Sequence, residues 1–458
     1  PRILCHAPSP RSMNLLRSSL FENRRTLALA APITAGFLGQ MLMGWADTIM
    51  VGRVSVVPLA ACAFANTVIA VPLVFGFGVL SSVSVRASIA HGGGHARLAG
   101  EALRAGLFLA GFLGIAIAAG IHAGVPLLPL LGQKPEVNAS CVTFLILCGW
   151  SILPVFLTTA AKNFSEALSR PWMPFWIVLA GVLLNILLNW ILIYGNLGAP
   201  ALGLDGAGLA TLIARVLVMV ALFFYIFLAP RLSGSLPLRW FGSGLVAQLR
   251  HLLVLGLPAG GLHLFEVTGF AIGSLMMGWI SIDALAAHQV AMTCVATSFM
   301  IPLGLSQAMS VRVGQARGAR DFARLLPIVA GGMGMALAVM IGAAALFVLA
   351  GPRIAGWFIA SPSVTALAAQ LLLIAGVFQI FDGLQVVASG TLRGFEDTRL
   401  PMIIGAVAYW AVALPISWVC AFRLGIGAPG IWLGFLVGLG VAATALLGRV
   451  VFRLRRAQ

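Results

Sequence analysis

The chain has 458 residues, of which 60% are apolar and 9% are charged, whereas soluble domains contain about 45–50% apolar and about 25% charged residues. So few charged side chains cannot cover the surface of a chain this long, and lipid must replace water around most of it. The composition therefore excludes a soluble globule, a disordered chain, a coiled coil and a secreted enzyme. It predicts an all-α, polytopic membrane protein.

The formal net charge is +16, from 28 basic and 12 acidic residues. A nucleic-acid-binding protein would gather its basic residues on one folded module, but here they are scattered through the gaps between apolar stretches, so we expect no nucleic-acid partner. The six cysteines form no C-x-x-C pair and indicate apolar packing residues. No apolar core of signal-peptide length precedes Leu27, and we expect the first span to be retained.

Long uncharged stretches follow one another along the chain. Each is sufficient for a helix of about 20 residues, which crosses a hydrocarbon layer of ~30 Å. Cutting the sequence at charges and at glycine and proline clusters predicts twelve transmembrane helices. In chain order they are 27–50, 57–83, 98–122, 137–158, 172–194, 206–229, 252–279, 286–311, 325–349, 363–388, 400–422 and 428–450.

The basic residues divide unequally between the two sides of this arrangement. With both termini on one side, 23 basic residues lie on that side, four lie on the other, and Arg215 falls within the sixth span. Cytoplasmic loops retain positive charge. Both termini are therefore predicted to be cytoplasmic.

The two halves of the sequence resemble each other at a constant offset of 226 residues. Pro32 matches Pro258, the Leu-Ala-Ala triplet at 59–61 matches that at 285–287, and the Ser-Val-Arg triplet at 84–86 matches that at 310–312. Each half holds six spans, which predicts two six-helix lobes related by a pseudo-two-fold axis along the membrane normal, with a substrate path between them. The predicted segments are a basic cytoplasmic N-terminal segment (1–26), an N-terminal lobe (27–230), a cytoplasmic linker (231–250), a C-terminal lobe (251–452) and a basic tail (453–458).

Three of the twelve acidic residues lie inside predicted spans: Asp47, Glu266 and Asp382. An ionised carboxylate at the centre of a span costs roughly 2.5–3.5 kcal/mol on insertion scales. Such a residue usually faces a cavity, where it binds a cation or holds a proton. The alternative is a position near the interface or a structural hydrogen bond, and Asp47 lies closest to a span end.

Polar side chains accompany the two acids of the second half. His263 lies one turn before Glu266, and Gln379 and Gln385 lie three residues on either side of Asp382. Residues three apart share a helix face. We therefore predict a polar cluster that extends around both acids.

In the first half, Gln40 lies seven residues before Asp47, and Asn185 and Asn189 lie one turn apart on the fifth predicted span. Amides within lipid must find hydrogen-bond partners. The two asparagines therefore either belong to a polar cavity around Asp47 or join neighbouring helices.

Enzyme motifs are missing from the sequence. It contains no H-E-x-x-H, no G-x-S-x-G and no G-x-x-x-x-G-K-[ST] pattern, and each of these carries a specific chemistry. We expect neither catalysis nor ATP hydrolysis by this chain, no cofactor, and no requirement for an ATPase partner.

Several segments resemble MATE (multidrug and toxic compound extrusion) transporters of the bacterial NorM type. They are QMLMGWADTIMVG (40–52), LAA (59–61), FE (265–266), LAAHQV (285–290), PLGLSQA (302–308), VRVG (311–314), FDGLQ (381–385) and GTLRG (390–394). The resemblance extends from about 27 to 449. It implies a protein of the bacterial inner membrane that exports cationic, lipophilic drugs or toxins in exchange for H⁺ or Na⁺ by rocking of the two lobes. We expect this protein to be a monomer.

The resemblance also implies roles for particular residues. The coupling cation is associated with Glu266 and Asp382, where Na⁺ is one possibility, and Asp47 is the acid of the first span. One position departs from the family pattern, because some Na⁺-coupled relatives have a tyrosine where this chain has Phe378. A lost oxygen ligand favours H⁺ over Na⁺ and leaves Phe378 as a candidate residue of the cavity wall.

Two other transporter classes are alternatives. A major-facilitator transporter also has twelve spans in two parallel halves, but its acidic and basic loop signature is absent between 86 and 101. A lipid-linked sugar flippase of the same wider superfamily would place cationic groups in the central cavity for an anionic headgroup, whereas the acids here favour a cationic cargo. An intramembrane aspartyl protease would need a G-x-G-D-like setting, which neither Asp47 nor Asp382 has.

Overall fold

The computed structural model describes residues 10–132, 134–237, 240–241, 244–358 and 361–457. Over these residues the chain is mostly helical, and twelve helical segments are long and apolar enough to cross a membrane. This result confirms the predicted all-α fold with twelve transmembrane helices. Parts of the expected N-terminal segment (1–9) and linker (238–239 and 242–243) lie outside the described residues.

The N-terminal lobe contains the first six spans. Its helices are α1 (Pro10–Gly52), α2 (Val56–Gly92), α3 (Ala96–Gly124) with the 3₁₀ turn η1 (Val125–Leu131), α4 (Pro135–Trp150) with α5 (Ile152–Ala167), α6 (Trp172–Tyr194) with η2 (Asn196–Gly198), and α7 (Gly203–Leu228). A short helix, α8 (Pro230–Ser233), follows.

The C-terminal lobe contains the other six spans. Its single-helix spans are α9 (Leu245–Ile280), α10 (Ile282–Gly318), α12 (Pro362–Gly394) and α15 (Ala428–Ala457), and the 3₁₀ turn η3 (Phe322–Arg324) leads into α11 (Leu325–Phe358). The eleventh span is composed of α13 (Arg399–Ala406), the π-helix η4 (Val407–Ala413), α14 (Leu414–Trp418) and the π-helix η5 (Val419–Arg423).

The fourth span extends further than the sequence predicts. The sequence predicts an end at 158, before the charged Lys162, but α5 continues to Ala167. The lysine is accommodated because its ammonium lies 3.7 Å from Glu166 and 4.8 Å from the centre of the Phe37 ring. The same span is divided at Ser151, where α4 ends and α5 begins.

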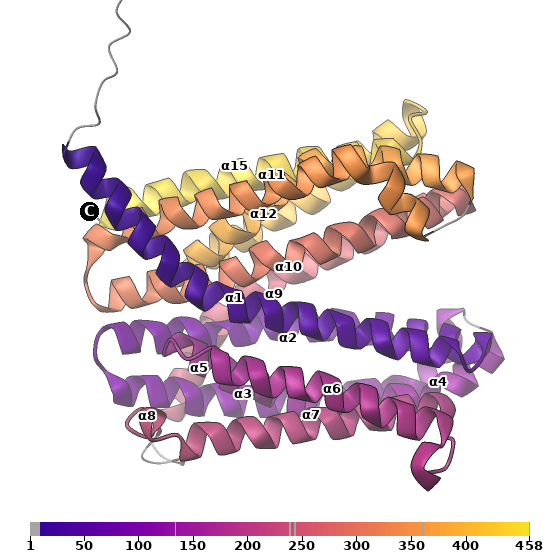
Figure 1. Ribbon diagram of the computed structural model, residues 1–458, viewed down its shortest axis with the longest axis horizontal. Coiled ribbons are helices and arrows are strands. Elements are labelled where there is room, and N and C mark those ends of the chain that lie inside the picture. Colours follow the sequence, from indigo (N-terminus) through magenta and orange to yellow (C-terminus); the bar gives the residue numbers. More distant parts are fainter. Residues whose placement is uncertain (1–9, 133, 238–239, 242–243, 359–360, 458) are drawn as a thin grey trace, which may run out of the picture.

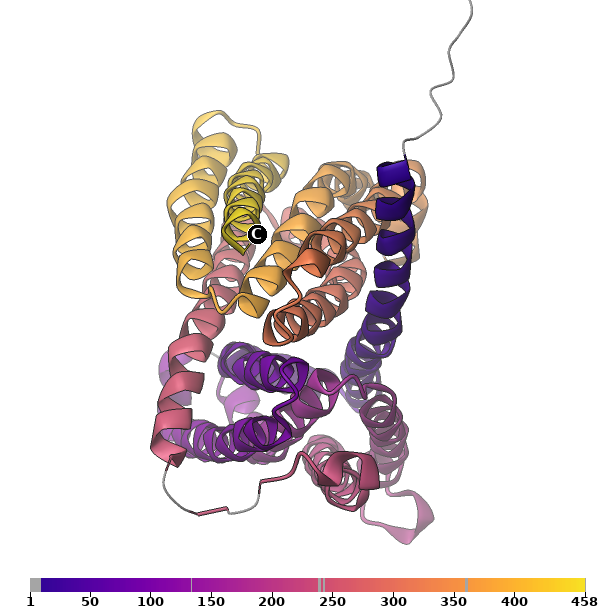
Figure 2. The same cartoon turned by 90° about the vertical axis from the view of Figure 1, so that its left-hand side faces the viewer.

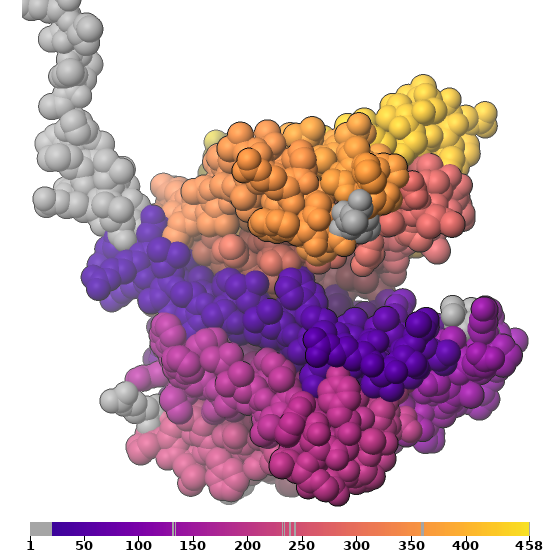
Figure 3. All heavy atoms as spheres, turned by 45° about the vertical axis from the view of Figure 1, so that its right-hand side comes forward, coloured from indigo at the N-terminus to yellow at the C-terminus, as the bar shows by residue number. Residues whose placement is uncertain are grey.

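The two lobes are in contact at one end of the molecule and diverge toward the other (Figure 1). We call the contacting end, where α1 begins and α15 ends, the termini face. There α2 and α10 approach so closely that a Cβ added to Gly92 would lie 2.0 Å from the main-chain oxygen of Gln315, and one added to Gly318 would lie 2.0 Å from that of Ile89. Figure 3 shows the two lobes as separate masses on the opposite side of this contact.

Two helices belong to both lobes. The first half of α1 packs on the C-terminal lobe, where Leu29 and Ile33 join a core formed mainly by α10, α11 and α12. The first half of α9 packs on α2 of the N-terminal lobe, with Gly256 and Gly260 against Val79. The second half of each helix returns to its own lobe, as the crossing paths of α1 and α9 show (Figures 1 and 2).

The internal repeat is visible in the backbone. The left-handed φ angles at Gly94 and Arg320, which are 226 residues apart, follow α2 and α10. A second pair, Ser169 and Glu396, follows α5 and α12 at nearly the same spacing. Non-glycine residues rarely adopt this conformation, so its recurrence at matching positions reflects the same connection in each half.

Candidate functional site

A cavity of about 390 Å³ lies between the lobes. Side chains from α1, α2 and α5 form one wall, and side chains from α9, α10 and α12 form the other. Much of the lining is apolar or aromatic, which suits a lipophilic ligand. The predicted site residues among the lining residues are Gln40, His263, Glu266 and Asp382.

Glu266 and Asp382 lie in the wall formed by the C-terminal lobe, with 9% and 3% of their surfaces exposed. The His263 Nδ1 atom lies 3.5 Å from Glu266 Oε2, and the Tyr409 hydroxyl lies 3.4 Å from Glu266 Oε1. Among the described residues, Asp382 Oδ1 has no hydrogen-bond partner. A buried acceptor without a partner is costly, so this oxygen is available to a ligand.

The other predicted residues of α12 lie behind the cavity wall. Gln385 accepts a hydrogen bond from the Tyr409 hydroxyl at 3.1 Å, and Gln379 donates to the Ser298 hydroxyl. Phe378 is fully buried, and its ring packs edge-on against Trp432 with ring centres 5.6 Å apart.

Phe378 is therefore a core residue of the C-terminal lobe and does not line the cavity. The expectation from sequence was wrong on this point. The position one turn before Asp382 is covered by aromatic side chains of α9 and α15, including Phe270 and Trp432.

The acid of the N-terminal lobe lies in a separate polar cluster. Asn189 Nδ2 donates to Asp47 Oδ1 at 2.5 Å and to Asn185 Oδ1 at 3.2 Å, and Asn185 Nδ2 donates to Thr211 at 3.3 Å. These residues do not line the cavity between the lobes. Of the two alternatives for the asparagines, the contacts match the joining of helices, because Asn189 contacts Asp47 of α1 and Asn185 contacts Thr211 of α7.

The cavity also contains basic and amide residues that the sequence analysis did not single out. Lys162 and Asn163 enter it from α5, and Gln307 and Arg393 enter it from α10 and α12. Gln307 Nε2 lies 3.4 Å from Asn163 Oδ1, which links the two lobes. The sequence could have indicated Lys162 as a candidate site residue, because it is one of only two lysines in the chain.

Polar contacts close the termini face. Glu396 lies 3.5 Å from Arg86 of the other lobe, 3.5 Å from Arg317 and 3.7 Å from His251. At the matching place in the repeat, Gln315 donates to the main-chain oxygen of Ala167 at 2.8 Å and lies 3.0 Å from the Ser169 hydroxyl. The Glu396–Arg86 contact and the contacts of Gln315 thus connect the region of a left-handed loop in one lobe to a helix of the other.

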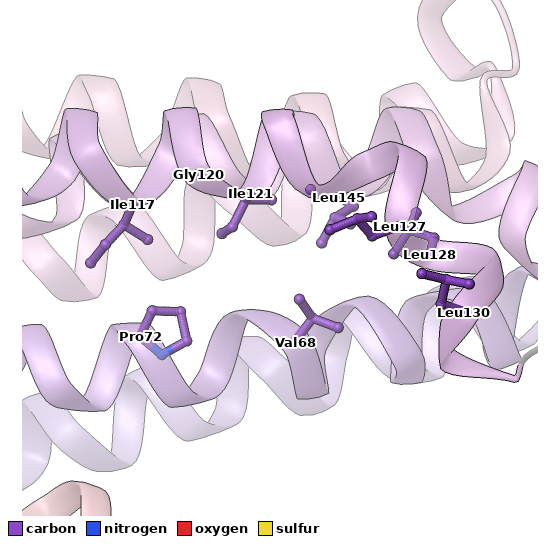
Figure 4. Close-up of a pocket in the computed structure, with 10 residues that line it drawn as sticks. Val68, Pro72, Ile117, Gly120, Ile121, Leu127, Leu128, Leu130 and Leu145 are labelled. Atoms are coloured by element: carbon purple, nitrogen blue, oxygen red, sulfur yellow. The ribbon is translucent and has the colours of Figure 1, made fainter.

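A second, apolar pocket of about 590 Å³ lies within the N-terminal lobe between α2, α3, η1 and α4. Pro72 and Val68 of α2 face Ile117 and Ile121 of α3, and leucines of η1 cover one end (Figure 4). It contains no charged side chain, so it has no feature that selects a cation.

The fold and the cavity define a multi-pass membrane protein with the architecture of a secondary transporter, in which two repeated lobes enclose a cavity between them. The MatE family model matches residues 32–191 and 258–419, once for each half of the chain. The chain belongs to the MatE (MATE transporter) family, which confirms the resemblance noted in the sequence.

The relatives match over nearly the whole chain. A probable multidrug resistance protein NorM of Pseudomonas putida is 38% identical, with 95% of each chain covered. A protein of the same name from Bradyrhizobium diazoefficiens is 37% identical, covering 94% of this chain and 93% of that protein. These relatives support the role of a multidrug efflux transporter.

Solved structures share the fold at lower identity. The eukaryotic MATE transporter AtDTX14 superimposes with a TM-score of 0.87 at 20% identity, covering 96% of this chain and 99% of that chain. A multidrug resistance MATE family transporter in an outward-facing conformation gives 0.88 at 19% identity, covering 95% and 97%. A MOP superfamily transporter from Pyrococcus furiosus, described as having reversed binding-pocket polarity, gives 0.86 at 18% identity, covering 95% and 96%.

Proposed function

We propose that this protein exports cationic, lipophilic compounds in exchange for inward-moving H⁺ or Na⁺. The observation that carries the proposal is the position of Glu266 and Asp382, two nearly buried acids in the wall of a largely apolar cavity between the lobes. An apolar lining suits the hydrocarbon part of such a compound, and a carboxylate suits its positive charge.

The two acids also account for exchange. A cation that neutralises Glu266 or Asp382 removes the attraction that retains a positively charged drug, so the drug leaves the cavity. A neutral carboxyl is cheaper to bury than a carboxylate. The lobes can then repack around the cavity and open on the other side, where the small cation is released.

The distribution of charge favours a cationic cargo over the anionic headgroup that a lipid-linked sugar flippase would carry. The cavity also contains Lys162 and Arg393, and among the described residues only the lysine is paired with a carboxylate. Lys162 lies 3.7 Å from Glu166, and Arg393 Nη2 lies 3.1 Å from the Ser306 hydroxyl. Asp382 Oδ1 and Arg393 Nε both lack a hydrogen-bond partner among the described residues. With Lys162 paired to Glu166, the cavity presents two acids, Glu266 and Asp382, and one arginine.

The termini face is proposed to be cytoplasmic, in the inner membrane of a bacterium, because most basic residues of the predicted loops lie on that side. With this face closed, the structure corresponds to a state that opens away from the cytoplasm. We propose that the protein works as a monomer without an ATPase partner, since each chain has both lobes and the cavity between them.

The test is ion-driven dye transport. Everted vesicles containing the protein receive ethidium and, separately, an imposed pH gradient or an imposed Na⁺ gradient. We expect Glu266→Gln and Asp382→Asn to abolish ion-driven transport at normal expression. Asp283→Asn is the matched control, because Asp283 lies at the start of α10 and contacts the exposed Ser363. The proposal fails if the first two variants still couple transport to either gradient.

A further inference from the structure

Tyr409 contacts the acid site from a helix that the sequence analysis did not connect to it. It lies in η4, the π-helical part of the eleventh span, and it is fully buried. It is one of only three tyrosines in the chain. Single π-helical turns occur often at functional sites, so the position of this side chain calls for a physical explanation.

The hydroxyl of Tyr409 has two acceptors and one hydrogen. Gln385 Oε1 lies 3.1 Å away and Glu266 Oε1 lies 3.4 Å away. A phenol can donate to only one acceptor at a time but can also accept. The hydroxyl can therefore donate to a charged Glu266, or turn to Gln385 when Glu266 is neutral.

The ring of Tyr409 is packed against α9, which carries Glu266. Gly269, three residues after Glu266 on α9, lies against this side chain, because a Cβ there would make an ordinary contact of 3.4 Å with Tyr409 Cβ. The Phe270 ring lies edge-on with its centre 5.8 Å from that of Tyr409. A phenylalanine would fill the same space without a polar atom to satisfy, so packing alone does not require the hydroxyl.

We propose that Tyr409 is a positioning residue of the cation-coupling site. Its hydroxyl donates a hydrogen bond to the Glu266 carboxylate while that group is charged, and donates to Gln385 instead when a cation neutralises Glu266. This inference rests on the proposed function. It also addresses Phe378, because the hydroxyl missing from the tenth span is supplied from the eleventh.

The proposal is tested with Tyr409→Phe, using ethidium transport in everted vesicles at varied pH and at varied Na⁺. We expect the ion concentration for half-maximal transport to change about tenfold, as expected for loss of a hydrogen bond to a charged group. With Na⁺ it rises, because an oxygen near the site is lost. With H⁺ the required proton concentration falls, because the charged carboxylate loses a donor.

The matched control is Tyr225→Phe, since Tyr225 lies in α7 and packs against the core of the N-terminal lobe, away from Glu266 and Asp382 in the C-terminal lobe. It should leave the half-maximal ion concentration unchanged. Membrane expression and the maximal transport rate separate a loss of folded protein from a change in ion affinity.

A second variant tests the same contact without altering the tyrosine. Gln385→Met removes the competing acceptor, so the hydroxyl stays on Glu266 and the half-maximal concentration should move opposite to that of Tyr409→Phe. The double variant Tyr409→Phe/Gln385→Met should have the same half-maximal ion concentration as Tyr409→Phe alone, because Gln385 acts through the tyrosine hydroxyl.

The outcomes separate the two proposals. Both fail if the wild-type protein shows no ion-driven transport or if Glu266→Gln retains it. The role of Tyr409 alone fails if the acids behave as proposed but Tyr409→Phe matches Tyr225→Phe within about twofold. It also fails if Gln385→Met has the same effect with and without the tyrosine hydroxyl.

Discussion

Glu396 should control how readily the lobes separate at the termini face. Its carboxylate lies 3.5 Å from Arg86 of the N-terminal lobe and 3.5 Å from Arg317 of its own lobe, with about a quarter of each side chain exposed. A partly exposed ion pair contributes ~0.2–1 kcal/mol. In Glu396→Gln the two arginines would also repel each other across the interface.

Together these effects predict that Glu396→Gln destabilises the closed termini face by ~1–2 kcal/mol, which changes the ratio of open to closed molecules by a factor of about 5–30. Spin labels at His95→Cys and Ala319→Cys, in a background without native cysteines, would report the separation of the two lobes. Both positions are exposed in loops of that face.

Asp397→Asn is the matched control for this prediction. Asp397 is adjacent in sequence and loses the same charge, but its carboxylate contacts Arg449 and Arg453 within its own lobe, each at 2.7 Å. The reasoning would be refuted if both variants gave the same distance distribution as the unsubstituted protein, or if Asp397→Asn opened the face as much as Glu396→Gln.

Two further predictions concern stability and packing. Glu22→Gln should lower the melting temperature in detergent, because Arg312 would remain buried without its carboxylate partner, a loss of ~3 kcal/mol in the free energy of unfolding. The control is Glu136→Gln at an exposed site, and equal melting temperatures for the two variants would contradict the prediction. Gly92→Ala should open the termini face, because its Cβ would lie 2.0 Å from a main-chain oxygen of α10. Gly111→Ala, with no atom within 4 Å, should not. Equal label distances in the two variants would refute the packing argument.

Much of the fold was predictable because lipid imposes simple rules on sequence. Length and hydropathy were sufficient to find twelve spans, and the 226-residue offset was sufficient to find two equivalent halves. Cutting at charges failed where a charge is satisfied inside the protein, as at Lys162, whose partners Glu166 and Phe37 cannot be paired from sequence alone.

The site was only partly predictable for a related reason. The acids Glu266 and Asp382 stood out because carboxylates are rare within spans. Tyr409 did not, since a tyrosine in an apolar stretch is unremarkable and a π-helix leaves no clear mark in sequence. Phe378 was misplaced because the resemblance relates it to a tyrosine of some relatives but does not show that α15 covers it here.

The first helix has a further consequence for how the protein is made. Its initial part packs against α10 and α11, which are synthesised more than 200 residues later. Until the second lobe is in place, Glu22 has neither Arg312 nor Arg324 to pair with. Neither lobe is therefore complete as an independent fragment, and α1 can reach its final position only after α11, which ends at Phe358, has been synthesised.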